Sequence, residues 1–188
     1  CLRLVGSEMC IRDRAAHQEV HSMLLRMREL AVQAANGTFG TADNAAMNEE
    51  INALEKEIKS ISDNTTFAGK NINTSTQTVF QVGRASANTL TVTFKDFDTS
   101  AIGADVGLTT ADTARAALTK IDAAISTIST RRGELGAASN RLSSVIANLD
   151  NISVNLASAR GRIQDTDFAV ETSNLARNQI MQQAATAM

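Results

Sequence analysis

The chain has 188 residues, enough for one sizeable domain or two small ones, and its formal net charge of -2 gives no electrostatic case for binding nucleic acid or an anionic membrane. Aromatic residues make up only 3% of it and proline is absent, so we expect long helices in thin layers rather than a thick globular core. No apolar run approaches the ~18 residues that a membrane-spanning helix needs, and no segment resembles a cleavable secretory signal.

Residues 1–14 differ in composition from the rest of the chain. This opening, "CLRLVGSEMCIRDR", holds both cysteines of the chain, Cys1 and Cys10. Its second half resembles a translated adapter or assembly remnant, so we interpret residues 1–14 as a non-native leader and leave them out of the fold prediction. The other residues include no cysteine, which excludes disulfides and thiolate metal sites among them.

Hydrophobic periodicity predicts a pair of helices in residues 15–71. The first helix is expected from about Ala15 to Ala35, and its apolar stripe consists of Val20, Leu24, Met27, Ala31 and Ala34. A turn at Asn36-Gly37 interrupts the pattern. The second helix, expected from about Asn44 to Ser62, carries the stripe Met47, Ile51, Leu54, Ile58 and Ile61. Both stripes are typical of short coiled-coil seams.

Residues 72–109 are rich in threonine, serine, asparagine and glycine, and they predict a short β-hairpin. The apolar positions alternate with polar ones on each side of "GRASANT": Phe80 and Val82 before it, then Leu90, Val92 and Phe94 after it. Because an isolated hairpin is only marginally stable, we expect its apolar face to lie on a helix.

Residues 110–163 carry the strongest pattern, a single long helix. The sequence "TTAD", Thr109 to Asp112, resembles a capping box, and the helix after it has an apolar residue at one heptad position throughout. These seam residues are Ile121, Ile128, Leu135, Leu142, Leu149, Leu156 and Ile163. The other seam position alternates apolar with polar residues, so the helix should face different partners along its length. "QDTD", Gln164 to Asp167, then interrupts the pattern, and a further helical stretch is expected from Phe168 to Met188, so that residues 164–188 form the last segment.

These elements together predict a mainly α fold. We expect an elongated antiparallel bundle or coiled coil of long helices, with one small β-hairpin region. Asp165 and Asp167 are interpreted as helix-capping residues rather than as catalytic carboxylates. His17 and His21 have a spacing that could bind zinc from one helix face, but no third ligand is evident, so we interpret them as ordinary helical histidines. No motif for catalysis, a cofactor or a metal is found, and we predict that the protein is not an enzyme.

The outward face of the first helix is the main candidate for an interaction surface. With the apolar stripe turned inward, steps of 100° place Arg26, Glu29 and Gln33 outside, Leu30 at the shoulder and Leu25 outward. A row of charged residues is usually no more than a solvated face. An arginine framed by exposed leucines is, however, typical of interaction hot spots, so both interpretations stay open on the residues alone.

Several long blocks resemble bacterial flagellin, in order and with similar separations. They include "VHSMLLRMRELAVQAANGT", "EEINALEKEIKSI", "NTTFAGKNI", "FQVG" and "NLASARGRIQDTDFAVETSNLARNQIMQQA". The resemblance covers the chain from about Glu19 to its end and implies the inner helical core domain of flagellin, with the variable outer region reduced to residues ~95–110. It also implies that residues 164–188 begin a truncated terminal helix, so this chain is expected to polymerise poorly.

The resemblance implies a structural subunit of the bacterial flagellar filament, which self-assembles through its core helices and gives motility. It implies an extracellular protein secreted by the flagellar type III export route. The implied partners are other subunits, an export chaperone, the filament cap and the Toll-like receptor of the host that senses flagellin. The implied receptor and filament interface comprises Leu24, Arg26, Glu29, Leu30, Gln33 and Glu50, and Leu25 stands where the family often has a polar contact residue.

Two other functions are kept as alternatives. The hook–filament junction protein belongs to the same superfamily, but it predicts a weaker match to "RMRELAVQAANGT" than this sequence shows. A helical signalling or adaptor coiled coil would explain the heptads, but it does not account for a hairpin with "FQVG" between the helices.

Overall fold

The computed structural model describes residues 2–74, 77–83, 85–104, 106–164 and 167–187. The chain divides into two compact units, Cys1–Ile146 and Ala147–Met188. Its helices are α1 (Leu2–Ala35), α2 (Thr41–Asn64), the short α3 (Thr99–Ile102), α4 (Ala111–Gln164) and α5 (Phe168–Ala187). Its strands are β1 (Thr66–Phe67), β2 (Lys70–Asn71), β3 (Gln77–Gln81) and β4 (Thr89–Thr93). The predicted mainly α fold with a small β-hairpin region is confirmed.

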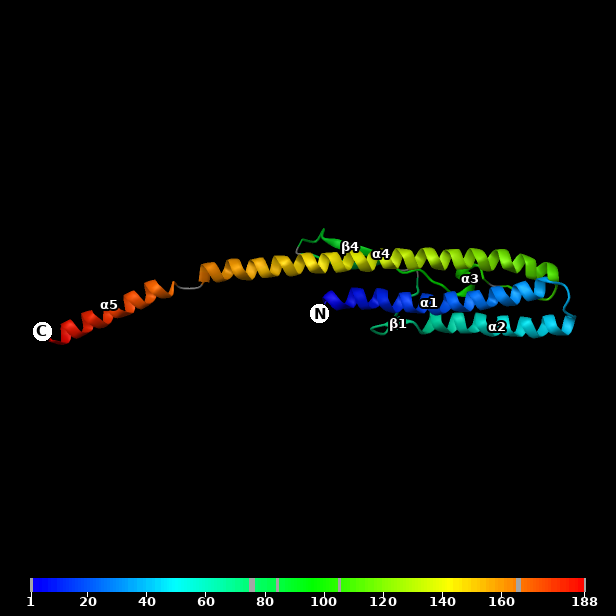
Figure 1. The fold of residues 1–188 in the computed structure, drawn as a ribbon, viewed down its shortest axis with the longest axis horizontal. Helices are drawn as coiled ribbons and strands as arrows, with labels where there is room; N and C mark the ends of the chain where they lie inside the picture. Colours follow the sequence, from blue (N-terminus) through cyan, green and yellow to red (C-terminus); the bar gives the residue numbers. More distant parts are fainter. Residues whose placement is uncertain (1, 75–76, 84, 105, 165–166, 188) are drawn as a thin grey trace. The chain divides into compact units, whose positions relative to one another are not determined.

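The first unit is built on three long helices, and α1 lies between α2 and α4 with the opposite chain direction to both (Figure 1). The predicted stripe of α1 is fully buried, with Val20, Leu24, Met27, Ala31 and Ala34 each 0% exposed. It meets Ile51 and Ile58 of α2 and the row Ala114, Ala117, Ile121, Ala124 and Ile128 of α4 in one hydrophobic cluster. The three helices therefore share one hydrophobic core, to which α1 contributes its whole predicted stripe.

Helix α1 begins earlier than the sequence pattern predicted. It starts at Leu2 instead of near Ala15, so the described part of residues 1–14 continues the same helix. Cys10 is buried against the β3–β4 hairpin and against the later part of α4 within the first unit. The absence of a side chain at Gly6 leaves room for the Phe80 ring, because a β-carbon at this position would lie 3.2 Å from that ring. Leaving residues 1–14 out of the fold was therefore wrong for their packing, and their non-native origin stays a prediction.

The predicted hairpin is formed by β3 and β4, which pair antiparallel with Phe80 opposite Leu90 and Thr78 opposite Val92. Its apolar face packs on a helix, as expected, because Leu90, Val92 and Phe94 share a buried cluster with Leu135 and Leu142 of α4. A second, smaller antiparallel pair, β1 with β2, was not predicted. Its turn places Ala68 and Gly69 at positive φ, and two-residue strands are too short to show a periodic pattern.

An extended segment directly before α4, residues 106–109, was also not predicted, and we call it the strap. The side chains of Val106 and Leu108 in the strap are buried, as is Ala104 at the end of the preceding described stretch. Side chains of α2 accept the backbone hydrogen bonds that a neighbouring strand would accept in a sheet. The Val106 N–H donates to Glu55 Oε1 at 2.9 Å, and the Leu108 N–H donates to Asn48 Oδ1 at 2.8 Å. Buried backbone donors need such acceptors, so α2 fixes the strap at these two residues.

The N-terminus of α4 is capped one residue later than predicted. The Thr113 N–H donates to Thr110 Oγ1 at 3.2 Å, and the Thr110 N–H donates to Thr113 Oγ1 at 2.9 Å. The capping box is thus Thr110 to Thr113, and the prediction of Thr109 with Asp112 was wrong. A threonine hydroxyl here takes the place of the usual glutamate, because it can also accept a hydrogen bond from the N–H of the capping residue.

The predicted seam of α4 is buried only in the first unit. Ile121 and Ile128 are 0% exposed, and Leu135 and Leu142 are 4% and 6% exposed. Leu149 is half-buried, whereas Leu156 and Ile163 are 68% and 85% exposed, so the seam stays a prediction beyond the first unit. The heptad pattern reports which residues share a face, and burial requires a partner as well.

The second unit consists of the rest of α4 and of α5, and no residue of α5 is buried. Asp167 caps α5 as predicted, accepting a hydrogen bond at Oδ1 from the Ala169 N–H at 3.0 Å. Asp165, the other predicted capping residue, lies outside the described residues.

Candidate interaction surface

The outward side of α1 presents apolar and polar side chains together. Leu25 and Val32 lie seven residues apart on one face and are 44% and 48% exposed. Glu29 and Gln33 are exposed beside them. We call these four residues, Leu25, Glu29, Val32 and Gln33, the α1 outer face. The sequence analysis predicted three of them and missed Val32, although its position one heptad after Leu25 could have revealed it.

Arg26 borders the α1 outer face on the side of α2. Its guanidinium donates from Nε to Glu50 Oε1 at 2.8 Å and from an Nη to Glu29 Oε2 at 3.1 Å. These hydrogen bonds raise the pKa of Arg26, and the bond to Glu50 has the larger effect. The structure thereby brings together three of the predicted site residues from two helices: Arg26, Glu29 and Glu50.

Arg28 borders the same face on the side of α4. Its Nε lies 2.7 Å from Asp122 Oδ1, and both side chains are about half exposed. This ion pair was not predicted, because nothing in the sequence shows that α4 passes beside α1 at this level. The α1 outer face is thus a half-apolar strip between two interhelical ion pairs.

Leu24 and Leu30, two of the predicted interface residues, are not on the surface. They are 0% and 2% exposed and belong to the main hydrophobic cluster. The helical wheel placed Leu30 at a shoulder, and the structure shows that this shoulder packs into the cluster shared with α2. The prediction that Leu30 is exposed was wrong, because a wheel of one helix does not give the width of the surface that its neighbours cover.

The two predicted ordinary histidines differ from each other. His17 is 1% exposed and its ring centroid lies 4.7 Å from that of Phe97, whereas His21 is only partly buried. His17 Nε2 stands 3.7 Å from Oδ2 of Asp13, which is itself fully buried, so these two residues form a polar pair inside the bundle. No group of three histidine, cysteine, aspartate or glutamate side chains suited to a metal occurs among the described residues.

Burial controls the ionisation of this pair. Desolvation raises the pKa of Asp13 to about 7, against a smaller opposing effect of Arg131. Desolvation also lowers the pKa of His17 to about 4, and the charges of Arg131 and Arg132 lower it further. Neither Asp13 oxygen nor His17 Nδ1 has a hydrogen-bond partner in the described part of the chain, so the pair is a costly feature of the core.

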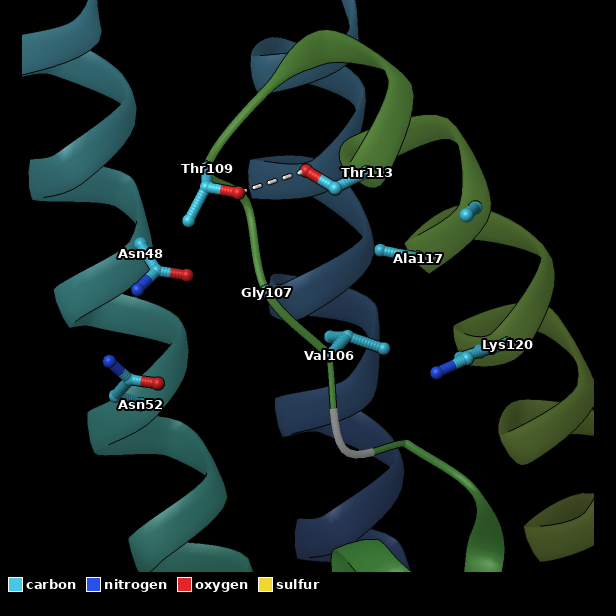
Figure 2. A pocket seen from close by; sticks show the side chains of 9 residues that line it. Asn48, Asn52, Val106, Gly107, Thr109, Thr113, Ala117 and Lys120 are labelled. Atoms are coloured by element: carbon cyan, nitrogen blue, oxygen red, sulfur yellow. Dashed lines mark hydrogen bonds between the residues drawn. The ribbon is translucent and has the colours of Figure 1, made fainter.

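An open hollow of about 460 Å³ lies between α2, the strap and the start of α4. Figure 2 shows Asn48 and Asn52 approaching it from α2, Lys120 from α4 and Gly107 on the strap. Asn48 is already engaged as the acceptor of the Leu108 N–H. The remaining groups are amides, hydroxyls and one ammonium, without a paired base and nucleophile, so the hollow has no arrangement for catalysis.

Comparison with known proteins identifies the family. The bacterial flagellin N-terminal helical region matches residues 4–78, and the bacterial flagellin C-terminal helical region matches residues 118–188. The flagellin of Halalkalibacterium halodurans is 41% identical over 188 residues, which cover 97% of this chain and 69% of that protein. The chain belongs to the bacterial flagellin family.

Other flagellins agree with this assignment. The flagellin of Bacillus subtilis is 36% identical over 222 residues, which cover 97% of this chain and 72% of the relative. The crystal structure of Bacillus cereus flagellin superimposes with a TM-score of 0.72 at 31% identity, covering 84% of this chain and 93% of that one. FliC from Burkholderia pseudomallei shares the fold, with a TM-score of 0.68 at 16% identity, covering 72% of this chain and 99% of that one.

Membership of the flagellin family makes this chain a structural protein, a subunit of the flagellar filament, and not an enzyme. It favours the filament-subunit interpretation over the junction-protein and adaptor alternatives. No helix among the described residues is both long and apolar enough to cross a membrane.

Proposed function

We propose that this flagellin chain uses the α1 outer face to contact neighbouring subunits of the filament. The observation that carries the proposal is the pair of exposed apolar residues, Leu25 at 44% and Val32 at 48%, placed between the Arg26–Glu50 and Arg28–Asp122 ion pairs. Apolar side chains surrounded by held charges are typical of protein interfaces, where the charges orient the partner and the apolar centre is dehydrated.

The inward and outward residues of α1 have different roles in this proposal. Inward residues such as Leu24 and Leu30 hold α1 in the bundle, and outward residues remain free to contact another molecule. The ion pairs fix the side-chain positions of Arg26 and Arg28 before a partner arrives, which lowers the entropy lost on binding. Leu24, Leu30 and Glu50 therefore support the surface from below or from its border, and Leu25, Glu29, Val32 and Gln33 would touch the partner.

A matched pair of substitutions tests this surface. Val32→Asp places a charge in the α1 outer face, and Val79→Asp places the same charge at a valine of β3 that is 59% exposed. We expect Val32→Asp to weaken concentration-dependent self-association by about tenfold or more, measured by sedimentation velocity, because an unpaired charge must then be desolvated. Val79→Asp should leave it unchanged. Equal behaviour of the two variants would refute the assignment of the surface.

We further propose that the Toll-like receptor that senses flagellin recognises the same face on released subunits. The support is the family resemblance of "RMRELAVQAANGT" together with the exposure of Glu29 and Gln33 and the fixed position of Arg26. Leu25 adds apolar area where the family often has a polar contact, so replacing it with glutamine should change the receptor response without altering the core.

Receptor recognition is tested by reporter-cell signalling with purified variants. Replacing Arg26 and Leu30 together should abolish signalling, but Leu30 is buried, so a loss of packing would have the same outcome. The cleaner variant is therefore Arg26→Ala with Gln33→Ala, because both residues are exposed. We expect it to lower signalling strongly while helix content by circular dichroism stays constant. Undiminished signalling would show that the receptor reads another surface.

We also propose that the chain is exported by the flagellar type III route and acts outside the cell, with an export chaperone and the filament cap as further partners. Family membership supports this proposal. Secretion into the medium, followed in cells with and without the flagellar export apparatus, is the measurement. Equal secretion by both strains would contradict it.

A further inference from the structure

Asn36 differs from every other asparagine of this chain in the residue that comes after it. It is the only asparagine with glycine as its next residue in the sequence. Asn36 and Gly37 lie in the connection between α1 and α2, and both are exposed. Gly37 has φ +68°, and a β-carbon added to it would meet no atom within 4 Å, so open space surrounds this peptide unit.

The backbone N–H after Asn36 is also free. The N–H of Asn36 itself donates to Gln33 O at 3.2 Å, but the N–H of Gly37 has no acceptor among the described residues. Asn64 at the end of α2, Asn71 in β2 and Asn88 just before β4 differ in this respect, because the next N–H is hydrogen-bonded in each case. Thr65 after Asn64 donates to Ile61 O at 3.0 Å, Ile72 after Asn71 to Thr65 O at 3.2 Å, and Thr89 after Asn88 to Ala87 O at 2.9 Å.

The remaining asparagines are held by other means. Asn73 is 3% exposed, and its Nδ2 donates to Ser62 O at 3.2 Å. The others lie inside α2, α4 or α5, where the next N–H belongs to the helical hydrogen-bond ladder: Asn44, Asn48, Asn52, Asn140, Asn148, Asn151, Asn155, Asn174 and Asn178. Sequence, exposure and hydrogen bonding therefore single out the same residue.

We propose that Asn36 is a site of spontaneous deamidation, a self-modification of this chain in water. The deprotonated Gly37 nitrogen attacks Asn36 Cγ, a bond forms between them, the bond from Cγ to Nδ2 breaks and ammonia leaves. The resulting succinimide ring is then opened by one water molecule. Attack of water at Cγ breaks the bond from Cγ to the Gly37 nitrogen and gives aspartate. Attack at the main-chain carbonyl carbon of Asn36 breaks the bond from that carbon to the Gly37 nitrogen and gives isoaspartate. The balance is one water gained and one ammonia lost, with no oxidant or reductant.

The reaction needs a nitrogen that can lose its proton and a backbone that can close a five-membered ring. A hydrogen-bonded N–H must first give up its acceptor, and a β-carbon on the next residue hinders the approach of its nitrogen to Cγ. Gly37 has neither obstacle. Either product places a new carboxylate next to the C-terminus of α1, where the helix dipole disfavours negative charge, and isoaspartate adds one atom to the main chain of this turn.

Peptide mapping of the purified full chain tests the proposal. The protein is incubated at mildly alkaline pH, and each asparagine peptide is followed by mass and by labelling with an isoaspartyl methyltransferase. We expect the Asn36 peptide to convert at least about tenfold faster than the Asn64 and Asn88 peptides of the same sample. Equal conversion rates for these three peptides would overturn the proposal.

Two variants separate the effect of sequence from that of structure. Asn36→Gln should remove the fast reaction, because a glutamine closes its ring far more slowly. Thr65→Gly creates a second Asn-Gly pair whose N–H still faces Ile61 O at the end of α2. While this variant is folded, we expect its Asn64 to convert more slowly than its Asn36. When the variant is unfolded in urea, we expect Asn64 and Asn36 to convert at the same rate. Fast conversion of Asn64 in the folded variant would show that the free N–H of Gly37 is not what selects Asn36.

Discussion

Arg26 and Arg28 are two residues apart on α1, yet they form ion pairs with different helices, Glu50 on α2 and Asp122 on α4. Their side chains leave the helix about 200° apart, one on each shoulder, because α1 has 3.6 residues per turn. Within one turn, α1 is therefore linked to α2 on one side by Arg26 and to α4 on the other side by Arg28. The strip between the two arginines is left uncovered by both of these helices.

The Arg28–Asp122 pair should contribute modestly to stability. Both side chains are about half exposed, so a double-mutant cycle with Arg28→Ala and Asp122→Ala should give a coupling of ~0.2–1 kcal/mol in urea unfolding. The coupling should decrease as salt is added, since the charges are accessible to ions. A coupling that does not change with salt would mean that the pair is shielded from solvent, against the exposure seen here.

Substitutions along the α4 seam should differ sharply between the two units. Ile128→Ala removes a fully buried side chain and should lower the free energy of unfolding by about 2–5 kcal/mol. Ile163→Ala changes a residue that is 85% exposed and should lower it by less than about 0.5 kcal/mol in the dilute chain. Urea denaturation followed by circular dichroism measures both. Similar losses for the two variants would show that Ile163 is packed in solution.

The strap should depend on its acceptors on α2. Asn48→Ala leaves the Leu108 N–H without the acceptor that now lies at 2.8 Å and should destabilise the first unit by about 1–3 kcal/mol. Asn48→Asp keeps an oxygen in the same place and serves as the control. Hydrogen exchange at Leu108 gives a local measurement, and we expect faster exchange only in the alanine variant.

The cap of α4 offers two adjacent threonines with different roles. Thr110→Ala removes the oxygen that accepts the Thr113 N–H and should lower stability by about 1 kcal/mol. Thr109→Ala leaves that hydrogen bond intact and should have a much smaller effect. The reverse order of the two losses, measured by thermal or urea unfolding, would restore the capping box at Thr109 that the sequence suggested.

The buried pair Asp13 and His17 should give two opposite pH dependences. The pKa of His17 falls from 6.5 to about 4 on folding, so its contribution is present above pH 6.5 and is lost as pH decreases through 4. The pKa of Asp13 rises from 3.8 to about 7, so its contribution is present below pH 3.8 and is lost as pH increases through 7. Between about pH 4 and 6.5 the two slopes should cancel.

A substitution of one member of this pair should reveal the pH dependence of stability that is due to the other member. With Asp13→Asn, stability should increase from pH 4 to 6.5, because only His17 still titrates. With His17→Gln, stability should decrease from pH 4 to 7, because only Asp13 does. Urea midpoints across this range, compared with the unsubstituted chain, provide the measurement. A flat profile in either variant would contradict the assigned direction of that group's pKa.

The sequence predicted most of what depends on local periodicity. The stripe of α1, the extent of α4 and the register of apolar residues in the hairpin all come from spacing, because burial repeats with the period of the element. It failed where burial depends on neighbours. Leu30 and Leu156 carry equally good helical patterns, but the cluster shared with α2 buries the first and no described residue buries the second.

The strap and the second ion pair could not be found in this way. Glu55 and Asn48 look like ordinary surface residues of α2, and their roles appear only once residues of the strap, far along the chain, lie beside them. The buried pair of Asp13 and His17 was missed for a related reason, since Asp13 lies in a segment that composition alone set apart. Polar residues carry no periodic signal that distinguishes a buried role from an exposed one.

The α4 seam extends beyond the bundle that covers its first half. Past Ile146 the same heptad position continues through Leu156 and Ile163, and α5 separately exposes Phe168, Leu175 and Ile180, each at least 58% exposed. Water therefore hydrates these apolar residues in a dilute chain, and any second polypeptide that covers them gains the corresponding hydrophobic free energy. The average hydrodynamic size of the purified chain should consequently increase with its concentration. The increase should be steeper the more of this apolar surface is left uncovered.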